Sequence, residues 1–231
     1  MDNRYYFHEY QDDFVVISLQ EFQHLTKVRR CKVGDSIVAF NGDGYDYHLT
    51  IKEMNKDKAI CSVVKKELNH AVRDKQITVY LAMIKNDALS TAIDNLAELN
   101  VRHVKLFRAD NSVANIDDSK LNKLKLYSIQ ASKQCERADI MDISIIDKRQ
   151  IEEDIMMYKN RFFAYENSTQ NITKFSGDFA VIVGPEGGFS DDEVEYFSSF
   201  AKNISLSKTI LRAEVACVCA VSALKAVSYE S

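Results

Sequence analysis

The chain has 231 residues, 46% of them hydrophobic and 28% charged, a composition typical of a soluble globular protein with one large or two smaller domains. The net charge of −4 argues against an indiscriminately basic nucleic-acid binder but allows a local basic patch. No stretch has the apolar length of a membrane span and the N-terminus lacks a signal-peptide pattern, so we expect a cytoplasmic protein with no membrane partner. The 5 cysteines are scattered without a CxxC pair, which favours reduced thiols and argues against a metal site.

The first seventy or so residues predict a β-rich domain with one helix. A short apolar strand at residues 12–18 precedes a helix at 20–30, and a hairpin follows at 36–54. The Asn-Gly-Asp-Gly run at 41–44 supplies the turn of this hairpin. Apolar and polar residues alternate again at residues 58–68, which predicts another strand. The simplest interpretation of this region is a small barrel closed around one helix.

From about Gln76 the pattern changes to alternating strands and helices. The apolar strand at residues 76–84, the helix at 87–99 and the strand at 101–107 form a βαβ unit, which predicts a parallel sheet covered by helices. Further elements are expected as helices around 118–137 and 151–160, strands at 161–167 and 178–184, a helix from Ser190, a strand at 203–207 and a helix from Ala213. The charged segment 65–76 is the predicted domain boundary.

The stretch VIVGPEGGFSDDEVEYF, residues 181–197, contains the only proline of the chain and three of its 7 glycines. It predicts a buried strand, a stiff bare turn and a helix capped by Ser190 with Glu193. Ligands of open α/β sheets bind at the carboxyl ends of strands, where glycine lets backbone approach them. The turn is therefore either a ligand loop or a tight connection only. It matches no phosphate-loop or nucleophile-elbow motif, and Glu186 would repel phosphate.

The stretch ISLSKTILRAEVACVCAVSAL, residues 204–224, predicts a strand end, a polar turn and a helix that is apolar nearly all round. Such a helix is buried in the core or against a second subunit. Arg212 and Glu214 stand at its start, on the same side of the sheet as the glycine-rich turn if the strands are parallel. A local salt bridge with an acidic first turn is the alternative interpretation of this pair.

Together, GPEGGFSDDEV and the later LSKTILRAEVA resemble the signature of the RsmE family of 16S ribosomal RNA uridine-N3 methyltransferases, in the SPOUT class. The similarity extends over nearly the whole chain. HLTKVRR with GDSIVAFNGDGYDYHLTI resembles the N-terminal PUA-like barrel of that family, and LAMIKNDALSTAIDNLAELNV its first strand and helix. QASKQCER and FFAYEN resemble two further family segments.

The resemblance implies an RNA-binding PUA-like β-barrel in residues 1–70 and a SPOUT α/β domain in residues 74–231, with a parallel sheet and a deep trefoil knot. It implies a homodimer that binds S-adenosyl-L-methionine and methylates N3 of a uridine in 16S rRNA, as free RNA or in the small ribosomal subunit, without a metal. Two alternatives remain open: a dimeric RNA-binding ribosome-assembly protein of the same fold, and a SPOUT methyltransferase acting on another RNA nucleotide.

The cofactor loops implied by the resemblance are residues 164–167, 184–188 and 206–211. The cofactor-binding candidates are Ala164, Tyr165, Glu166, Val183, Gly184, Pro185, Glu186, Gly187, Gly188, Leu206, Ser207, Ile210 and Leu211. For catalysis, Arg212 is the first candidate to stabilise the uracil anion, since its guanidinium presents donors as a fork.

Arg137 is a second candidate, with an RNA phosphate as an equal alternative partner, and Glu186 or Glu214 could accept the uracil proton. The RNA-binding candidates are Arg29, Arg30, Lys32 and Lys133, although basic clusters are often only solvated surface.

The chain also departs from the family pattern at several positions. Ser207 stands where glycine is usual, and a positive φ there would strain the serine. Ala213 and Val215 replace threonines. Gln130 replaces a glutamate and Glu136 a glycine.

Overall fold

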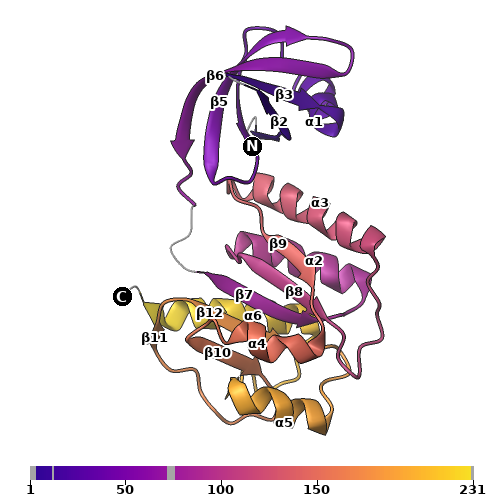
Figure 1. The fold of residues 1–231 in the computed structure, drawn as a ribbon, viewed down its shortest axis with the longest axis vertical. Helices are drawn as coiled ribbons and strands as arrows, with labels where there is room; N and C mark the ends of the chain where they lie inside the picture. Colours follow the sequence, from indigo (N-terminus) through magenta and orange to yellow (C-terminus); the bar gives the residue numbers. More distant parts are fainter. Residues whose placement is uncertain (1–3, 12, 72–75, 230–231) are drawn as a thin grey trace. The chain divides into compact units, whose positions relative to one another are not determined.

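The structure is a computed structural model, and it describes residues 4–11, 13–71 and 76–229. The chain divides into two compact units (Figure 1), which comprise residues 1–72 with 132–140 and residues 73–131 with 141–231. The predicted boundary segment 65–76 includes residues 72–75, which lie outside the described part of the chain.

The first unit is built on one curled, mixed sheet of 6 strands in the order β1-β4-β5-β6-β3-β2. Strand β1 is parallel to β4, and the other neighbouring pairs are antiparallel. The strands are β1 (Arg4–Tyr6), β2 (Glu9–Gln11), β3 (Phe14–Ser18), β4 (Ser36–Phe40), β5 (Tyr45–Met54) and β6 (Lys58–Leu68). Two register shifts between β5 and β6 increase the local twist, and the sheet curls into a half-barrel.

The expected single helix of this unit is confirmed. It begins as α1 (Leu19–Gln23) and continues as a π-helical turn, His24–Val28. Phe22 and Leu25 lie on its inner face and pack in one core with Val15 and Ile17 of β3. The alternation of apolar residues along the strands thus places one face of the curled sheet on the helix.

Residues 132–140, which comprise the last residues of α3 and the segment after it, belong to the first unit. The side-chain amide of Asn69 donates to the backbone oxygen of Glu136 at 3.0 Å, and the N–H of Gly44 donates to the oxygen of Ala138 at 3.2 Å. Glu136 has a φ of 61°, a left-handed conformation that favours glycine. This explains in physical terms why glycine is suitable at this position.

The second unit is an α/β layer structure whose sheet of 6 strands has the order β13-β10-β12-β7-β8-β9. All neighbouring pairs are parallel, as the βαβ pattern predicts. The strands are β7 (Ile77–Ala82), β8 (His103–Phe107), β9 (Asp142–Ile145), β10 (Asn160–Ala164), β12 (Phe179–Val183) and β13 (Lys202–Ile204). A separate parallel pair is formed by β11 (Phe175–Ser176) and β14 (Ser228–Tyr229).

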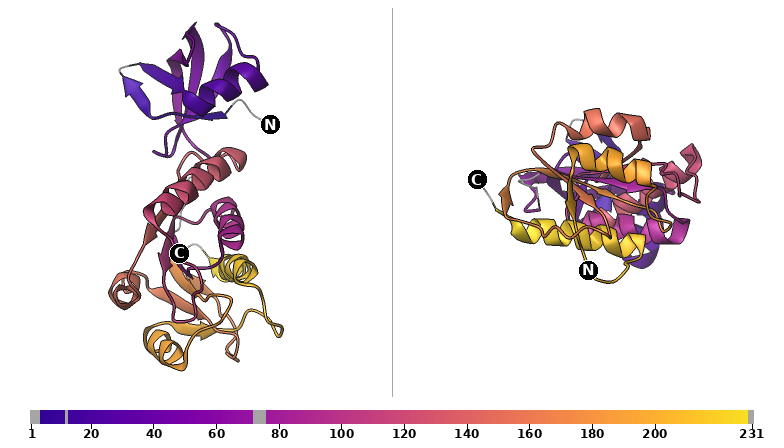
Figure 2. Two further views of the ribbon diagram at one scale, coloured as in Figure 1. Left: turned by 90° about the vertical axis from the view of Figure 1, so that its right-hand side faces the viewer. Right: turned by 90° about the horizontal axis from the view of Figure 1, so that it is seen from below.

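Helices cover both faces of this sheet (Figure 2). They are α2 (Asn86–Glu98), α3 (Asp118–Gln134), α4 (Ile151–Ile155), α5 (Asp191–Phe200) and α6 (Ala213–Val227). Strand β12 shows how its continuous apolar run serves two cores. Phe179, Val181 and Val183 pack in the core that includes α2 and α6, whereas Ala180 and Ile182 pack in the core that includes α4 and α5. A strand buried on both sides needs no polar alternation.

Several elements differ from the sequence prediction, which also did not include the short strands β1, β2, β11 and β14. Helix α3 ends at Gln134, so Arg137 lies beyond it, and the helix expected at 151–160 is only the short α4. It ends early because the chain must enter β10 at Asn160. Strand β9 was not anticipated, since its four residues carry too short a pattern to detect.

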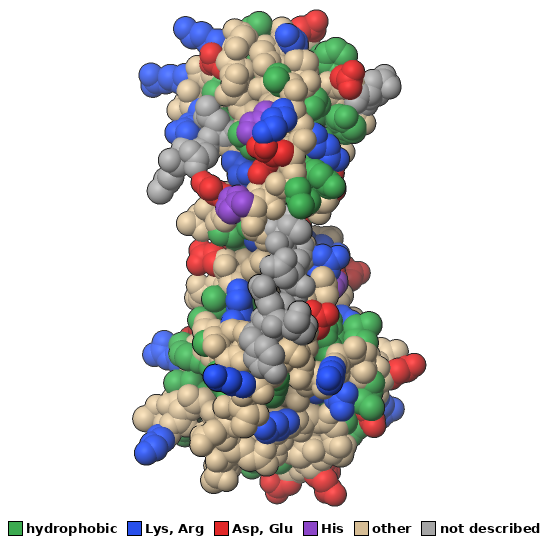
Figure 3. Space-filling model, turned by 90° about the vertical axis from the view of Figure 1, so that its left-hand side faces the viewer, with side chains coloured by type: hydrophobic (Ala, Val, Ile, Leu, Met, Phe, Trp, Pro, Cys, Tyr) green, Lys and Arg blue, Asp and Glu red, His purple; other side chains and the backbone are tan. Residues whose placement is uncertain are grey.

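No helix in the described ranges combines the length and apolar character needed to cross a membrane. On the face drawn in Figure 3, lysine and arginine side chains are interspersed with aspartate and glutamate. This mixture agrees with the small net charge of −4.

Candidate active site

The strand order brings three loops to one edge of the second sheet. Strands β13, β10 and β12 are direct neighbours and parallel, so their carboxyl ends lie at the same edge. The segments that follow them are residues 165–167 after β10, residues 184–188 after β12, here called the glycine loop, and residues 205–211 after β13, here called the serine loop. These are the three segments in which the sequence placed its ligand candidates.

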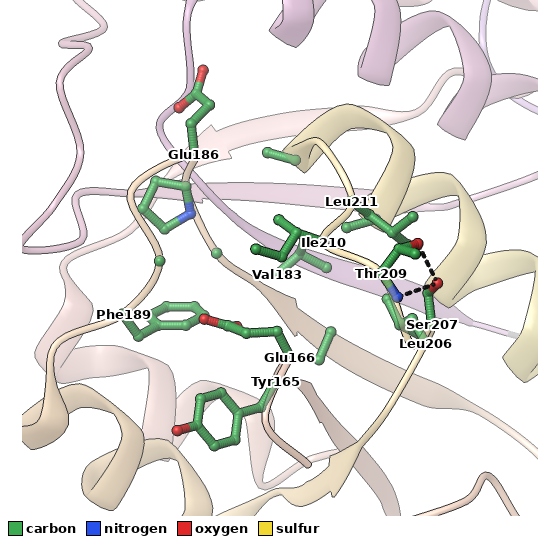
Figure 4. A pocket seen from close by; sticks show the side chains of 16 residues that line it. Tyr165, Glu166, Val183, Glu186, Phe189, Leu206, Ser207, Thr209, Ile210 and Leu211 are labelled. Atoms are coloured by element: carbon green, nitrogen blue, oxygen red, sulfur yellow. Dashed lines mark hydrogen bonds between the residues drawn. The ribbon is translucent and has the colours of Figure 1, made fainter. Parts of the chain in front are cut away.

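The three loops enclose a pocket with about 640 Å³ of empty space, its open mouth included (Figure 4). Its lining consists of Ala164, Tyr165, Glu166, Val183, Gly184, Pro185, Glu186, Gly188, Phe189, Leu206, Ser207, Thr209, Ile210, Leu211, Ala213 and Ala216. Every candidate cofactor residue except Gly187 is in this set.

Four lining residues were not among the candidates: Phe189, Thr209, Ala213 and Ala216. The sequence held a signal for each of them. Phe189 directly follows the glycine pair and Thr209 lies inside the serine loop. Ala213 and Ala216 are three residues apart at the start of α6, so they share one face of that helix.

The glycines of the glycine loop are required by their neighbours as well as by any ligand. A Cβ atom at Gly184 would lie 2.6 Å from Cε2 of Phe189. The Phe189 ring cannot yield easily, because it packs against Phe163 and Phe197 with centroids 5.0 and 5.4 Å away. Gly188 has a φ of +70°, which a side chain would strain. The loop can therefore follow this path only with these glycines.

Asn111, in the segment after β8, fastens the glycine loop from outside. Its side-chain amide donates to the backbone oxygens of Gly187 and Gly188, both at 3.2 Å. A Cβ atom at Gly187 would lie 3.0 Å from Cβ of Asn111, so the two segments are in close contact. Inside the loop, the N–H of Gly188 donates to the oxygen of Pro185 at 3.0 Å.

A charged network holds the next part of the chain. The Nζ atom of Lys148 lies 2.5 Å from Oδ1 of Asp110 and 2.8 Å from Oε1 of Glu193. Glu193 also accepts the N–H of Asp110 at 2.9 Å, and the hydroxyl of Ser190 donates to Asp110 at 2.7 Å. The predicted capping box of Ser190 and Glu193 at the start of α5 is confirmed.

The network shifts the ionisation of its members. The hydrogen bond from Lys148, followed by that from Ser190, holds the pKa of Asp110 below its ordinary value. Partial burial opposes the charge of Lys148, but hydrogen bonds to Asp110 and Glu193 raise its pKa overall. Both groups are therefore charged at neutral pH, and they tie the end of β8 to the start of α5.

Glu186 has a partner outside the pocket. One of its carboxylate oxygens accepts the backbone N–H of Lys85 at 3.1 Å. Lys85 is the N-cap residue of α2, where unpaired backbone N–H groups favour an acceptor. This hydrogen bond gives Glu186 a structural role, and it makes Glu186 a weaker candidate for the residue that accepts the uracil proton.

The serine loop is held by fewer contacts. The hydroxyl of Ser207 accepts the N–H of Thr209 at 3.1 Å and lies 2.9 Å from its hydroxyl. Ser207 is not among the described residues with positive φ, so the serine is unstrained where glycine is usual in the family. Ile210 is 91% exposed, and in the described part of the chain no acceptor is recorded for its N–H or for that of Leu211.

Arg212 and Glu214 are not among the lining residues of the pocket, although they alternate along the chain with the lining residues Leu211 and Ala213. Arg212 lies between the lining residues Leu211 and Ala213, and it is the N-cap residue of α6. Its side chain is exposed and has no hydrogen-bond or ion-pair partner among the described residues. Glu214 follows in the first turn of α6 and is half-buried. No salt bridge joins the two side chains in this part of the described structure, contrary to the alternative interpretation.

The other basic candidates lie in the first unit. Arg29, Arg30 and Lys32 are exposed near the end of the α1 segment. Arg137 is only 1% exposed, and its guanidinium pairs with the carboxylate of Asp139 at 3.1 Å. Lys133 pairs with Glu21 at 2.8 Å, with both side chains mostly buried. These contacts favour a structural role for both residues, in place of the catalytic or phosphate contact expected of Arg137 and the RNA contact expected of Lys133, because a buried charge must keep its partner.

Family models identify both parts of the chain. One described as an RNA methyltransferase domain matches residues 72–225, and one described as an RNA methyltransferase PUA domain matches residues 18–64. The chain belongs to the RNA methyltransferase family. Within this family, the Ribosomal RNA small subunit methyltransferase E of Rickettsia conorii is 30% identical over 96% of this chain and 95% of that protein. The protein of the same name from Helicobacter pylori is 29% identical over 86% of this chain and 88% of that protein. The expected resemblance to the RsmE family is thus confirmed.

Solved structures share the fold of this RNA methyltransferase. A putative methyltransferase of Legionella pneumophila, solved with bound SAM, has a TM-score of 0.84 at 24% identity and covers 99% of this chain and 98% of that chain. A Ribosomal RNA small subunit methyltransferase E of Neisseria gonorrhoeae, bound to S-adenosyl methionine, has a TM-score of 0.83 at 20% identity, with 97% of each chain covered. The fold class expected from the sequence, a PUA-like domain and a parallel α/β domain in one chain, is confirmed.

Proposed function

We propose that this protein transfers a methyl group from S-adenosylmethionine to N3 of a uridine in 16S ribosomal RNA. The observation that carries the proposal is the convergence of three strand-end loops on one pocket at the carboxyl edge of the sheet. The relatives named as small subunit rRNA methyltransferases support the RNA substrate, and the two structures with bound SAM support the cofactor.

The residues around the pocket fit this cofactor. The carboxylate of Glu166 belongs to the lining, that of Glu186 is turned away toward the backbone of Lys85 (Figure 4), and none of the described lining residues is lysine or arginine. This charge suits a sulfonium cation and disfavours a cofactor that carries phosphates. Apolar side chains and bare backbone form the remaining wall, which suits a planar ring held by backbone groups.

S-adenosylmethionine supplies a methyl group bonded to a positively charged sulfur, which a nitrogen lone pair can attack. N3 of uracil carries a proton and becomes a good nucleophile only when that proton leaves. We assign Arg212 to orient the uracil and stabilise its developing negative charge, because it directly follows the lining residue Leu211 and its exposed guanidinium has no partner among the described residues. Glu214, in the first turn of α6, is the better proton acceptor, since Glu186 already accepts the N–H of Lys85.

The expected domain roles and assembly complete the proposal. Residues 1–70 would bind RNA, and residues 74–231 would carry the cofactor site, the trefoil knot and the dimer contact. Exposed apolar residues at the start of α6 support a homodimer, since Ile210 is 91% and Val215 41% exposed. A cytoplasmic location is consistent with an rRNA substrate.

The test is to incubate the purified protein with methyl-labelled S-adenosylmethionine and small ribosomal subunits or free 16S rRNA from cells that lack the gene. Digestion and mass spectrometry of the nucleosides should reveal N3-methyluridine. Labelling of another nucleoside would contradict the substrate assignment. Absence of S-adenosylmethionine binding in calorimetry would contradict the reaction itself and leave an RNA-binding protein.

A further inference from the structure

A second hollow lies in the first unit, between the start of α1 and the turn that joins β5 to β6. This groove has about 1130 Å³ of empty space, its open mouth included. It is lined by Val16, Ser18, Leu19, Phe22, Gln23, Thr26, Lys27, Lys56, Asp57 and Lys58. The sheet register explains the meeting of these segments, because Ser18 at the end of β3 pairs directly with Lys58 at the start of β6.

The positive charges of the groove differ from most others in the first unit. Elsewhere in this unit, several basic side chains are paired with carboxylates: Arg4 with Asp46, Lys65 with Glu67, Lys66 with Asp43, Lys133 with Glu21 and Arg137 with Asp139. Lys27, Lys56 and Lys58 have no ion-pair partner among the described residues, and Asp57 is the only acidic residue of the described lining. The groove therefore keeps a positive rim that nothing described in this chain neutralises.

Leu19 presents an exposed apolar side chain in the lining of the groove. Its side chain is 74% exposed, and its φ of 54° is a left-handed conformation that leucine rarely adopts. Phe22 forms part of the apolar floor and is 7% exposed. A residue held in a costly conformation that presents an apolar side chain to solvent is characteristic of a binding surface.

We propose that this groove binds a single-stranded segment of the substrate RNA, with Lys27, Lys56 and Lys58 contacting phosphates and Leu19 packing against an unstacked base. The lysines select a polyanion by charge complementarity. The apolar contact selects an unpaired segment, because bases inside a duplex hide their faces by stacking. The inference rests on the proposed function in that the RNA is the methylation substrate. The groove is distinct from the exposed residues Arg29, Arg30 and Lys32.

The test measures fluorescence anisotropy of a labelled, uridine-rich single-stranded RNA of 15 nucleotides with the full-length protein at several salt concentrations. The variant Lys27→Ala with Lys56→Ala and Lys58→Ala should raise Kd at least ~10-fold at low salt. It should also reduce the slope of log K against log salt by ~2, since each phosphate contact on a single strand contributes ~0.7. Leu19→Ser should raise Kd about threefold without changing the slope, as an uncharged contact does.

The matched control is Lys65→Ala with Lys66→Ala, which removes two lysines that already have carboxylate partners. It should change the slope by less than half as much as the groove variant. An unchanged slope in the groove variant, or equal effects of both variants, would overturn the proposal. Equally strong competition by polyglutamate would instead indicate an acidic protein partner and also overturn it.

Calorimetry with S-adenosylmethionine and the methylation assay separate the two proposals. The groove variant should bind S-adenosylmethionine with unchanged Kd, because the cofactor pocket lies in the second unit, and an unchanged urea-unfolding profile should report that the first unit is folded. If the wild-type protein methylated no RNA but still bound RNA through the groove lysines, the proposed reaction would fail and the groove would stand. If methylation occurred with an unchanged RNA affinity in the groove variant, the reaction would stand and the groove would fail.

Discussion

The glycine loop and the serine loop face the same pocket but are held very differently. Asn111 fastens the glycine loop from outside, Glu186 anchors it to α2, and Phe189 fills the space beside Gly184. The serine loop is stabilised mainly by the short-range contacts of Ser207 with Thr209, and Ile210 is almost fully exposed. One wall of the site is therefore preformed, and the opposite wall has few contacts that would resist adjustment to a ligand or a second subunit.

The largest effect is expected from Gly184→Val. The new side chain would overlap the Phe189 ring, whose packing against Phe163 and Phe197 leaves it little room. We expect a loss of ~2 kcal/mol in the free energy of unfolding, as for other overpacked sites, and no detectable S-adenosylmethionine binding. Urea unfolding and calorimetry measure the two quantities.

A double substitution provides the control for this clash. Gly184→Ala should be less harmful than Gly184→Val, and adding Phe189→Leu should restore part of its lost stability. If the two substitutions were additive, the Phe189 ring would not be the reason for glycine at this position.

Arg212→Ala tests the wall of the site formed by the serine loop and the start of α6. Removal of a charged donor that stabilises the reacting base should lower kcat ~100-fold. Binding of S-adenosylmethionine should change little, since Arg212 is not among the lining residues. Single-turnover methylation measures the chemical step, and Lys208→Ala, which changes an exposed cation of the same loop, is the control. Equal turnover in wild type and Arg212→Ala would remove Arg212 from the mechanism.

Lys148→Met tests the network behind the glycine loop. It leaves Glu193, whose side chain is 2% exposed, without its cation and should lower the free energy of unfolding by ~1–3 kcal/mol at pH 7. The exposed Lys159→Met is the control and should have almost no effect.

The pH dependence of this loss follows from Asp110. Its folded pKa lies below the ordinary value, so its ion pair with Lys148 stabilises the fold above about pH 4 and is lost as pH falls through the folded pKa. The difference between wild type and Lys148→Met should therefore shrink in acid. A difference independent of pH between 3 and 7 would show that the Asp110 pair contributes nothing.

Asn111→Ala tests the outer contact of the preformed wall. It removes two hydrogen bonds to glycine-loop oxygens, and we expect the Kd for S-adenosylmethionine to rise ~10-fold, because each bond contributes about 1 kcal/mol at most. Asn115→Ala in the same segment should not change the affinity. Equal Kd values for both variants would mean that the loop keeps its shape without Asn111.

The smallest effect is expected from Ser207→Gly. The serine already has an ordinary backbone conformation, so the family's glycine should change the Kd for S-adenosylmethionine less than threefold. Stability should fall slightly, since glycine adds freedom to the unfolded chain and the contact with Thr209 is lost. A large gain in affinity would show that the serine side chain obstructs the pocket.

Some features of the site could be predicted from the sequence, and others arise only from contacts that the fold creates. The glycine loop was indicated by the residues themselves, because it follows an apolar strand and contains the proline and three glycines, whereas the other two loops were expected only from the resemblance to the family. The partners of Arg137 and Lys133 could not be predicted, since Asp139 and Glu21 meet them only through the fold of the first unit. The contacts of Lys148 with Asp110 and Glu193 join distant segments in the same way.

Local conformation was equally hidden. The left-handed φ of Glu136 is visible only as a departure from the family's glycine, and that of Leu19 carries no sequence signal at all. The strain of Ser207 expected from the same reasoning is absent, because its hydroxyl accepts the N–H of Thr209 and the backbone keeps a negative φ.

The return of residues 132–140 to the first unit has a practical consequence for fragment design. An expression fragment cut at residue 72 would lack the backbone partners of Asn69 and Gly44 and the cation that neutralises Glu21. The chain passes from one unit to the other three times, at residues 72–73, 131–132 and 140–141. A protease would therefore have to cut all three connections to separate the two complete units. Domain-swap chimeras of this family therefore need a second, internal segment grafted together with the N-terminal one.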